Sequence, residues 1–68
     1  MIIEIGIIAG DIWNLLEERG DLALGEIYDC LGYQKDRILM SIGWLAREGH
    51  IALEKVGEDF QISLRKKK

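Results

Sequence analysis

The segment Gly43-Trp44-Leu45-Ala46-Arg47-Glu48-Gly49-His50-Ile51 joins the end of a helix to the start of a strand. Apolar residues recur at helical spacing from Lys35 to Glu48, which predicts a helix, and Gly49 follows at the position where helices commonly end. After Gly49 the apolar residues recur with a period of two instead. The inward-facing residues expected for this helix are Ile38, Leu39, Ile42, Leu45 and Ala46.

Alternating apolar residues after Gly49 predict two strands, one from Ile51 to Val56 and one from Phe60 to Leu64. Gly57-Glu58-Asp59 is the expected turn between them, so the two strands form a β-hairpin. The inner face of this hairpin is expected to carry Ile51, Leu53, Phe60, Ile62 and Leu64.

Two further helices are predicted before this segment. The first runs from Glu4 to Arg19 and ends at Gly20; a short edge strand over residues 22–24 and a two-turn helix over residues 25–32 follow. A tight turn over residues 32–34 leads into the third helix. The buried residues expected here are Ile5, Ile8, Ala9, Ile12, Trp13 and Leu16 in the first helix, and Ile27, Cys30 and Leu31 in the second.

The order helix, short strand, helix, turn, helix, hairpin predicts a winged helix-turn-helix fold, mainly α with a small β-hairpin as the wing. Residues 5–13, together with residues 43–51, resemble a small bacterial and archaeal family of stand-alone winged helix proteins of unknown function. The resemblance covers nearly the whole chain. It implies the fold and self-association, and it carries no catalytic residues. One departure is Gly25, where the family more often has a serine that would cap the second helix.

A chain of 68 residues is one domain at most. We expect residues 1–64 to form a single winged helix domain and residues 65–68, Arg-Lys-Lys-Lys, to be a disordered basic tail. The apolar N-terminal stretch contains Glu4 and falls short of the roughly 20 residues that a membrane span needs. We therefore expect no membrane partner. Because the chain has one cysteine and can form no internal disulfide, we also expect a reduced, cytoplasmic location.

The chemistry-bearing residues are too few to predict an enzyme. Cys30 is the single cysteine and His50 the single histidine, so the sequence offers no internal disulfide and no zinc ligand set. Cys30 is expected in the core, and His50 in a partly exposed loop. We expect no catalytic activity and no cofactor.

Charge is distributed unevenly along the chain. Residues 1–64 hold five basic and twelve acidic side chains, a net charge of −7, and residues 65–68 add +4. Glu54, Glu58 and Asp59 surround Lys55 in the predicted wing. Because DNA is a polyanion, the body of the protein and its wing disfavour nucleic acid as a partner.

The outward face of the third helix carries Met40, Gly43, Trp44 and Arg47. Reading DNA bases requires polar or basic side chains there, whereas methionine and tryptophan are typical of protein interfaces. Three interpretations stay open: the face binds a second copy or another protein, Trp44 packs under the wing as extra core, or the face contacts nucleic acid. The candidate nucleic-acid contacts are Lys35, Arg37, Arg47 and Lys55.

A second apolar line in the first helix, Ile3, Gly6, Ile7 and Gly10, lies apart from the core stripe. Small residues in such a line permit another element to approach closely. The sequence thus predicts a non-catalytic interaction module that forms a homodimer. Its candidate interface residues are Ile3, Ile7, Met40, Gly43 and Trp44. The alternative is a transcriptional regulator that binds DNA as a homodimer through the third helix.

Overall fold

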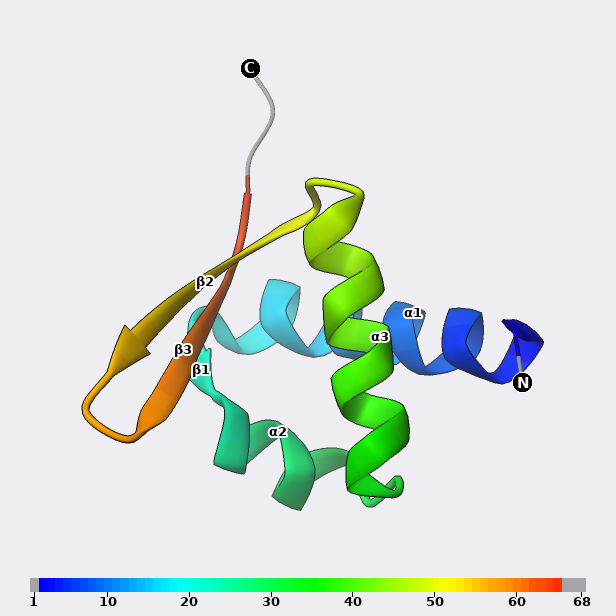
Figure 1. Cartoon of the computed structure of the whole chain (residues 1–68), viewed down its shortest axis with the longest axis horizontal. Helices are drawn as coiled ribbons and strands as arrows, with labels where there is room; N and C mark the ends of the chain where they lie inside the picture. Colours follow the sequence, from blue (N-terminus) through cyan, green and yellow to red (C-terminus); the bar gives the residue numbers. More distant parts are fainter. Residues whose placement is uncertain (1, 66–68) are drawn as a thin grey trace.

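Figure 1 shows the computed structural model of the chain, which describes residues 2–65. Met1 and the last three lysines of the predicted basic tail lie outside this range. Three helices stack against a small sheet, as the sequence predicts, and the winged helix-turn-helix arrangement is confirmed. The elements are α1 (Ile2–Arg19), β1 (Leu22–Ala23), α2 (Leu24–Leu31), α3 (Lys35–Arg47), β2 (Ile51–Val56) and β3 (Asp59–Leu64).

The junction between α3 and β2 depends on Gly49. Its φ of +79° lies in the left-handed region that favours glycine. The Gly49 N–H donates to the carbonyl of Ala46 at 3.1 Å, and the His50 N–H donates to the carbonyl of Leu45 at 2.9 Å. These bonds satisfy the last carbonyls of the helix and turn the chain into the strand.

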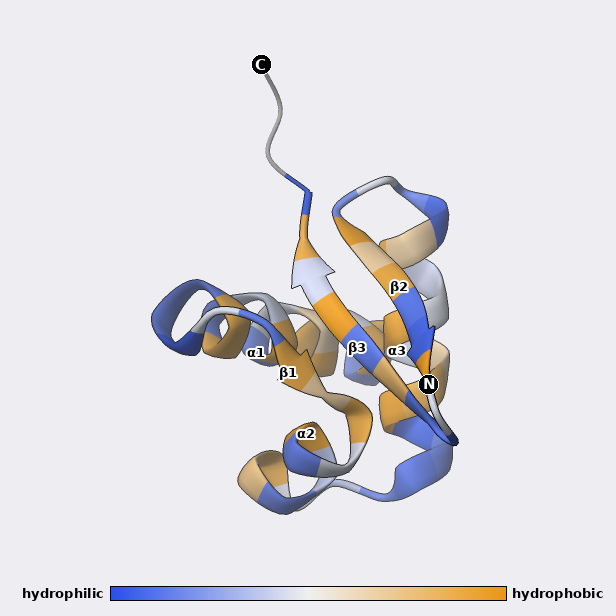
Figure 2. Ribbon diagram, turned by 90° about the vertical axis from the view of Figure 1, so that its left-hand side faces the viewer, coloured by the Kyte–Doolittle hydropathy of each residue, from blue (hydrophilic) through white to orange (hydrophobic). Residues whose placement is uncertain are grey.

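The three strands form one antiparallel sheet in the order β1-β3-β2, and Figure 2 shows β2 on the side next to α3. Val56 pairs with Asp59, so only Gly57 and Glu58 form the loop, one residue fewer than predicted. Gly57 has a φ of +65° at the first loop position, as in a type II′ turn. The hairpin β2–β3 is the wing.

The core lies where α1 crosses α3 and both meet the sheet. Its buried apolar residues are Ile8, Ala9, Ile12, Leu16, Leu22, Ile27, Ile38, Ile42, Leu45, Ile51 and Ile62. Ser41 is also fully buried, which the sequence does not predict. Its hydroxyl lies 2.9 Å from the carbonyl oxygen of Arg37 and 3.2 Å from that of Ile5, so it joins α3 to α1.

The expected burial of Cys30 and Leu39 is wrong, because both side chains are exposed. α2 begins at Leu24, and its inward face is set by Leu24, Ile27 and Leu31. At about 100° per residue, Cys30 lies well off that face. Leu39 lies at the edge of the buried face of α3 and is 48 % exposed.

The residues toward the tip of the wing are also less buried than predicted. The register places Leu53 and Phe60 on the same face as Ile62, as expected, yet both are nearly half exposed. The hairpin extends past the helices that cover its base. Trp13, expected in the core, is partly exposed as well. Gly25 lies inside α2 and Ala23 is the capping residue, so the expected capping role of position 25 is wrong.

The turn between α2 and α3 is tied to α1 by one hydrogen bond. The Tyr33 hydroxyl donates to Asp11 Oδ2 at 2.6 Å. This bond raises the pKa of Tyr33 above its ordinary 10.0, with smaller contributions from partial burial and the charges of Asp11 and Glu4. The bond thus stabilises the fold fully below the ordinary pKa, and the stabilisation is lost as pH rises through the raised pKa.

We expect Tyr33→Phe to lower the free energy of unfolding at pH 7, because the bond to Asp11 is lost. The difference from the wild type should shrink at pH 11, because the unfolded wild-type tyrosine ionises above its ordinary pKa of 10.0 whereas the raised pKa holds the proton on the bonded hydroxyl. Urea unfolding followed by tryptophan fluorescence at both pH values measures this. Asp11→Asn, whose amide oxygen still accepts the bond, is the control. An equal loss at both pH values would contradict the role of the hydroxyl proton.

Candidate functional site

The outward face of α3 is built from one ridge of side chains. Met40 and Trp44 lie one turn apart, and Trp44 is 48 % exposed. The Trp44 ring lies 6.4 Å from the His50 ring between centroids, at a tilt of 41°. The interpretation that Trp44 packs under the wing as extra core is therefore wrong, and the ring is open to solvent along much of its surface.

An apolar groove runs between this ridge and the wing. It has a volume of about 170 Å³, and Gly43 forms part of its wall. The other lining residues are Leu24, Leu39, Ile42, Leu53, Phe60 and Ile62. Sequence periodicity does not reveal this groove, because it assigns Leu39, Leu53 and Phe60 to the core. The one feature of the sequence that could have predicted the groove is the length of the hairpin. Its outer half extends past the helix that covers its base.

A second groove lies on the other side of the ridge, between α3 and α1. It has a volume of about 420 Å³ and brings Trp44 and His50 next to Gly6, Gly10 and Trp13. The small residues of the second apolar line of α1 therefore lie beside the tryptophan of α3. Ile3 and Ile7 belong to the same line and are 79 % and 58 % exposed, but they line neither groove.

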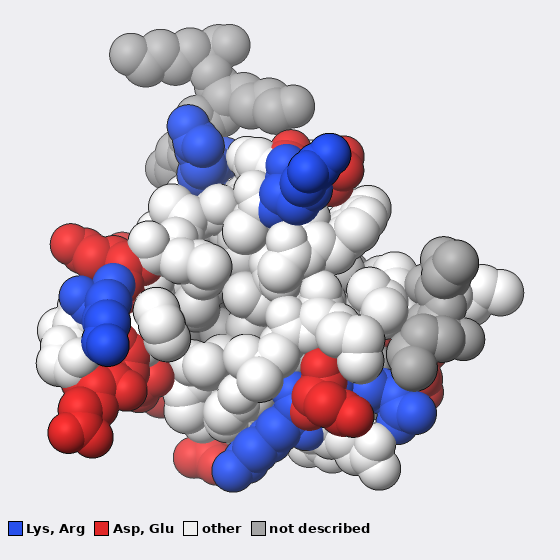
Figure 3. Space-filling model, viewed as in Figure 1, with Lys and Arg blue, Asp and Glu red and all other residues white. Residues whose placement is uncertain are grey.

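Charged side chains surround this face and leave its centre free. Figure 3 shows an uncharged area over α3 and the adjoining wing, with Lys, Arg, Asp and Glu side chains around its edge. Charges of both signs alternate along that edge. A face with an apolar centre and a charged rim is the usual anatomy of a protein–protein interface.

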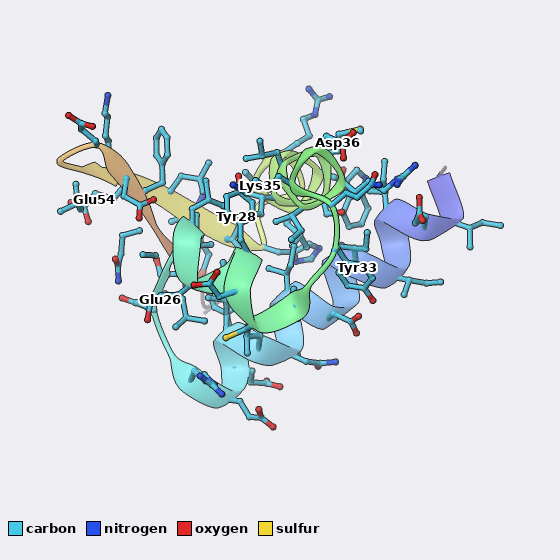
Figure 4. All side chains as sticks on the ribbon, turned by 90° about the horizontal axis from the view of Figure 1, so that it is seen from below. Glu26, Tyr28, Tyr33, Lys35, Asp36 and Glu54 are labelled. Carbon is cyan, nitrogen blue, oxygen red and sulfur yellow. The ribbon has the colours of Figure 1, made fainter. Side chains whose placement is uncertain are left out.

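The four candidate nucleic-acid contacts do not form one basic surface. Lys35 lies with its Nζ 5.3 Å from the centre of the Tyr28 ring, a cation–π contact. Figure 4 labels both side chains, which come from neighbouring ends of α2 and α3. Arg37 pairs through Nε with Glu4 Oε1 at 2.7 Å and donates to Gln34 Oε1 at 2.5 Å. Two of the four cations thus contact groups of their own chain.

The two other cations lie far from this pair. Arg47 is in the last turn of α3, and Lys55 is in the wing between acidic neighbours. Burial chiefly, and then the negative charge of Asp59, raises the pKa of Tyr28.

The single cysteine and the single histidine lie at different places in the fold. Cys30 is exposed, and His50 is half-buried at the α3–β2 junction with its ring beside Trp44. Residues 2–65 contain no group of three His, Cys, Asp or Glu side chains arranged to hold a metal ion. None of the helices in this range is long and apolar enough to cross a membrane.

Fold and surface together define a winged helix-turn-helix domain whose third helix presents an apolar outward face. Residues 1–64 match the family described as Winged helix-turn-helix domain (DUF2582), and the chain belongs to that family. An uncharacterized protein of Methanocaldococcus jannaschii is 40 % identical over 65 residues, which cover 91 % of each chain. No solved structure matches the chain. The family resemblance predicted from the sequence is thus confirmed.

The glycines of this surface give a test of its construction. A Cβ added at Gly6, Gly10 or Gly43 meets open space, so no contact within the chain requires glycine there. Glycine inside a helix costs roughly 0.5–1 kcal/mol relative to alanine. We expect Gly10→Ala to raise the free energy of unfolding by about that amount, measured by urea unfolding at low protein concentration.

Gly49→Ala is the control for this test, because the φ of Gly49 is positive and alanine is strained there. That variant should lose stability while Gly10→Ala gains it. A loss in Gly10→Ala would mean that the groove beside α1 does not have room for a methyl group.

Proposed function

We propose that this protein is a non-catalytic interaction module that forms a homodimer through the outward face of α3. The observation that carries the proposal is the Met40–Trp44 ridge, half exposed between two apolar grooves in an area without charge. Removing such an apolar ridge from water lowers the free energy, so a partner that covers it is favoured. The confirmed fold alone gives no function, since winged helix domains serve several.

Covering this ridge contributes substantially to the free energy of association. Covering the exposed half of one tryptophan, on the order of 100 Å², contributes roughly 2 kcal/mol. In a two-fold dimer each copy contributes its own Trp44, so the gain occurs twice. Tryptophan near the centre of an interface is the commonest kind of residue to dominate binding.

A second copy fits this face because the face is self-complementary. Going around α3, Leu39 and Gly43 border one groove, and Met40 and Trp44 form the ridge beside it. A two-fold axis through this area places the ridge of each copy against the groove of the other. Gly43 lets the two helices approach closely, since it carries no side chain on the wall between ridge and groove.

DNA binding is the second candidate, and the helix-turn-helix arrangement favours it. Lys35 and Arg37 are in the first turn of α3, where a recognition helix commonly contacts DNA. Against it, Arg47 is the single basic residue on the outward face, and residues 2–65 carry six basic and twelve acidic side chains. We therefore place DNA binding behind self-association.

We expect Trp44→Glu to weaken the dimer by at least thirtyfold, a loss of about 2 kcal/mol, because it puts a charge into the apolar centre. Sedimentation equilibrium over a range of concentrations measures the dissociation constant. Lys35→Glu is the matched control, since it adds the same side chain to the same helix outside the ridge. A wild type that remains monomeric at high concentration would sink the proposal.

A titration with mixed-sequence duplex DNA at low salt separates the two candidates. Low salt gives phosphate attraction its best chance. We expect amide signals of residues 35–47 and of the wing to stay in place when followed by NMR. Shifts there that weaken steeply with added salt, and that vanish in Lys35→Glu, would favour the DNA-binding regulator instead.

A further inference from the structure

The outer edge of the wing offers a second contact on the same face as α3. β2 is an edge strand, because the sheet order β1-β3-β2 leaves one of its sides unpaired within the described chain. All of its residues except Ile51 are exposed. An unpaired edge of this length presents backbone N–H and C=O groups that another strand can bind.

One hydrogen bond at the base of β2 shows which of its residues bond toward β3 and which point to the free edge. The Arg65 N–H donates to the carbonyl of His50 at 2.9 Å, so the backbone of residue 50 faces β3. Antiparallel ladders alternate, and Ala52 and Glu54 therefore also bond toward β3. The backbone groups that point to the free edge belong to Ile51, Leu53 and Lys55.

This free edge lies beside the α3 ridge. α3 contacts β2, and Figure 2 shows β2 at the side of the sheet next to α3, while Figure 1 shows that the start of β2 is the part nearest α3. Leu53, at the middle of the strand, shares a groove with Leu39 and Gly43 of α3. A strand added to β2 would therefore cover part of the same uncharged area.

We propose that β2 pairs antiparallel with β2 of a second copy, centred on Leu53, to join the two three-stranded sheets into one of six strands. This inference rests on the proposed homodimer and gives its geometry. A two-fold axis perpendicular to the sheet keeps the inner faces of both sheets on one side. Both α3 helices are on that side, so the ridge of each copy faces the groove of the other across the same axis.

The register follows from charge and from the number of bonds. Centring on Leu53 sets Ile51 opposite Lys55 of the second copy and Ala52 opposite Glu54, with about six backbone hydrogen bonds. If the centre of the pairing moves from Leu53 toward the hairpin turn, Glu54 lies opposite Glu54 of the second copy, or Lys55 lies opposite Lys55. Like charges directly opposite each other are destabilising. If the centre moves toward the base of the strand, the backbone groups of Lys55 have no partner on the second copy. A centre at Leu53 avoids both the like-charge pairs and the lost hydrogen bonds.

Isotope-filtered NMR on a mixture of labelled and unlabelled wild-type chains tests this pairing. In the Leu53-centred register, Ala52 and Glu54 of the two copies are a non-hydrogen-bonded pair, whose backbones come closest. We expect an intermolecular contact between their Hα atoms, and slow hydrogen exchange at the Leu53 and Lys55 amides. Both amides should exchange fast in Trp44→Glu, which keeps the chain monomeric.

Lys55→Pro gives a second readout, because it removes an N–H that the intrachain ladder does not use. Losing that bond at both symmetric positions should weaken the dimer by about tenfold to a hundredfold. Circular dichroism and the β2–β3 cross-strand contacts verify that the wing still forms. A wild-type dimer with fast exchange at Leu53 and Lys55 and no contact between the strands would overturn the pairing but leave the α3 dimer standing. Absence of any dimer would overturn both.

Discussion

The crossing of α1 over α3 determines the rest of this structure. Ile8 and Ile12 of α1 are buried together with Ile38 of α3, and the Ser41 hydroxyl bonds the backbone of both helices at the crossing. A hydroxyl is small enough to let two helices approach, and it can donate to the second lone pair of a carbonyl inside a helix. With the core stripe of α1 turned inward, its glycine line must face outward beside Trp44. The apolar outer surface is therefore a direct result of how the core is packed.

Periodicity predicted the elements well, because the chain has no proline and each of the three helices is followed by a glycine of positive φ, at Gly20, Gly32 and Gly49. Burial was harder to predict, since it depends on where each element starts and how far its neighbour extends. Leu24 belongs to α2 and not to the preceding strand, so the inward face of α2 is turned toward Leu24. Cys30 therefore lies outside the core. Leu53 and Phe60 have the predicted facing but lack a helix above them. Ser41 is polar, and a pattern of apolar residues cannot identify it.

The candidate surface was predictable in its centre and not at its borders. Met40, Gly43 and Trp44 follow from helical geometry alone, because no third helix of this length can bury all its sides. The grooves on each side depend on tertiary contacts between distant segments, such as Gly10 with Trp44. The contacts of Arg37 with Glu4 and of Lys35 with the Tyr28 ring likewise could not be predicted from the sequence.

The distribution of polar and apolar groups on α3 is the reverse of what DNA recognition requires. A helix that reads bases needs hydrogen-bonding side chains at its centre and cations at its rim that are free to meet phosphates. Here the centre is Met40, Gly43 and Trp44, and the rim carries acidic residues as well as cations. Salt would weaken the rim interactions but not the apolar centre, whose strength comes from removing surface from water. In the function proposed above, the same fold keeps its helix-turn-helix geometry and uses it to bind protein.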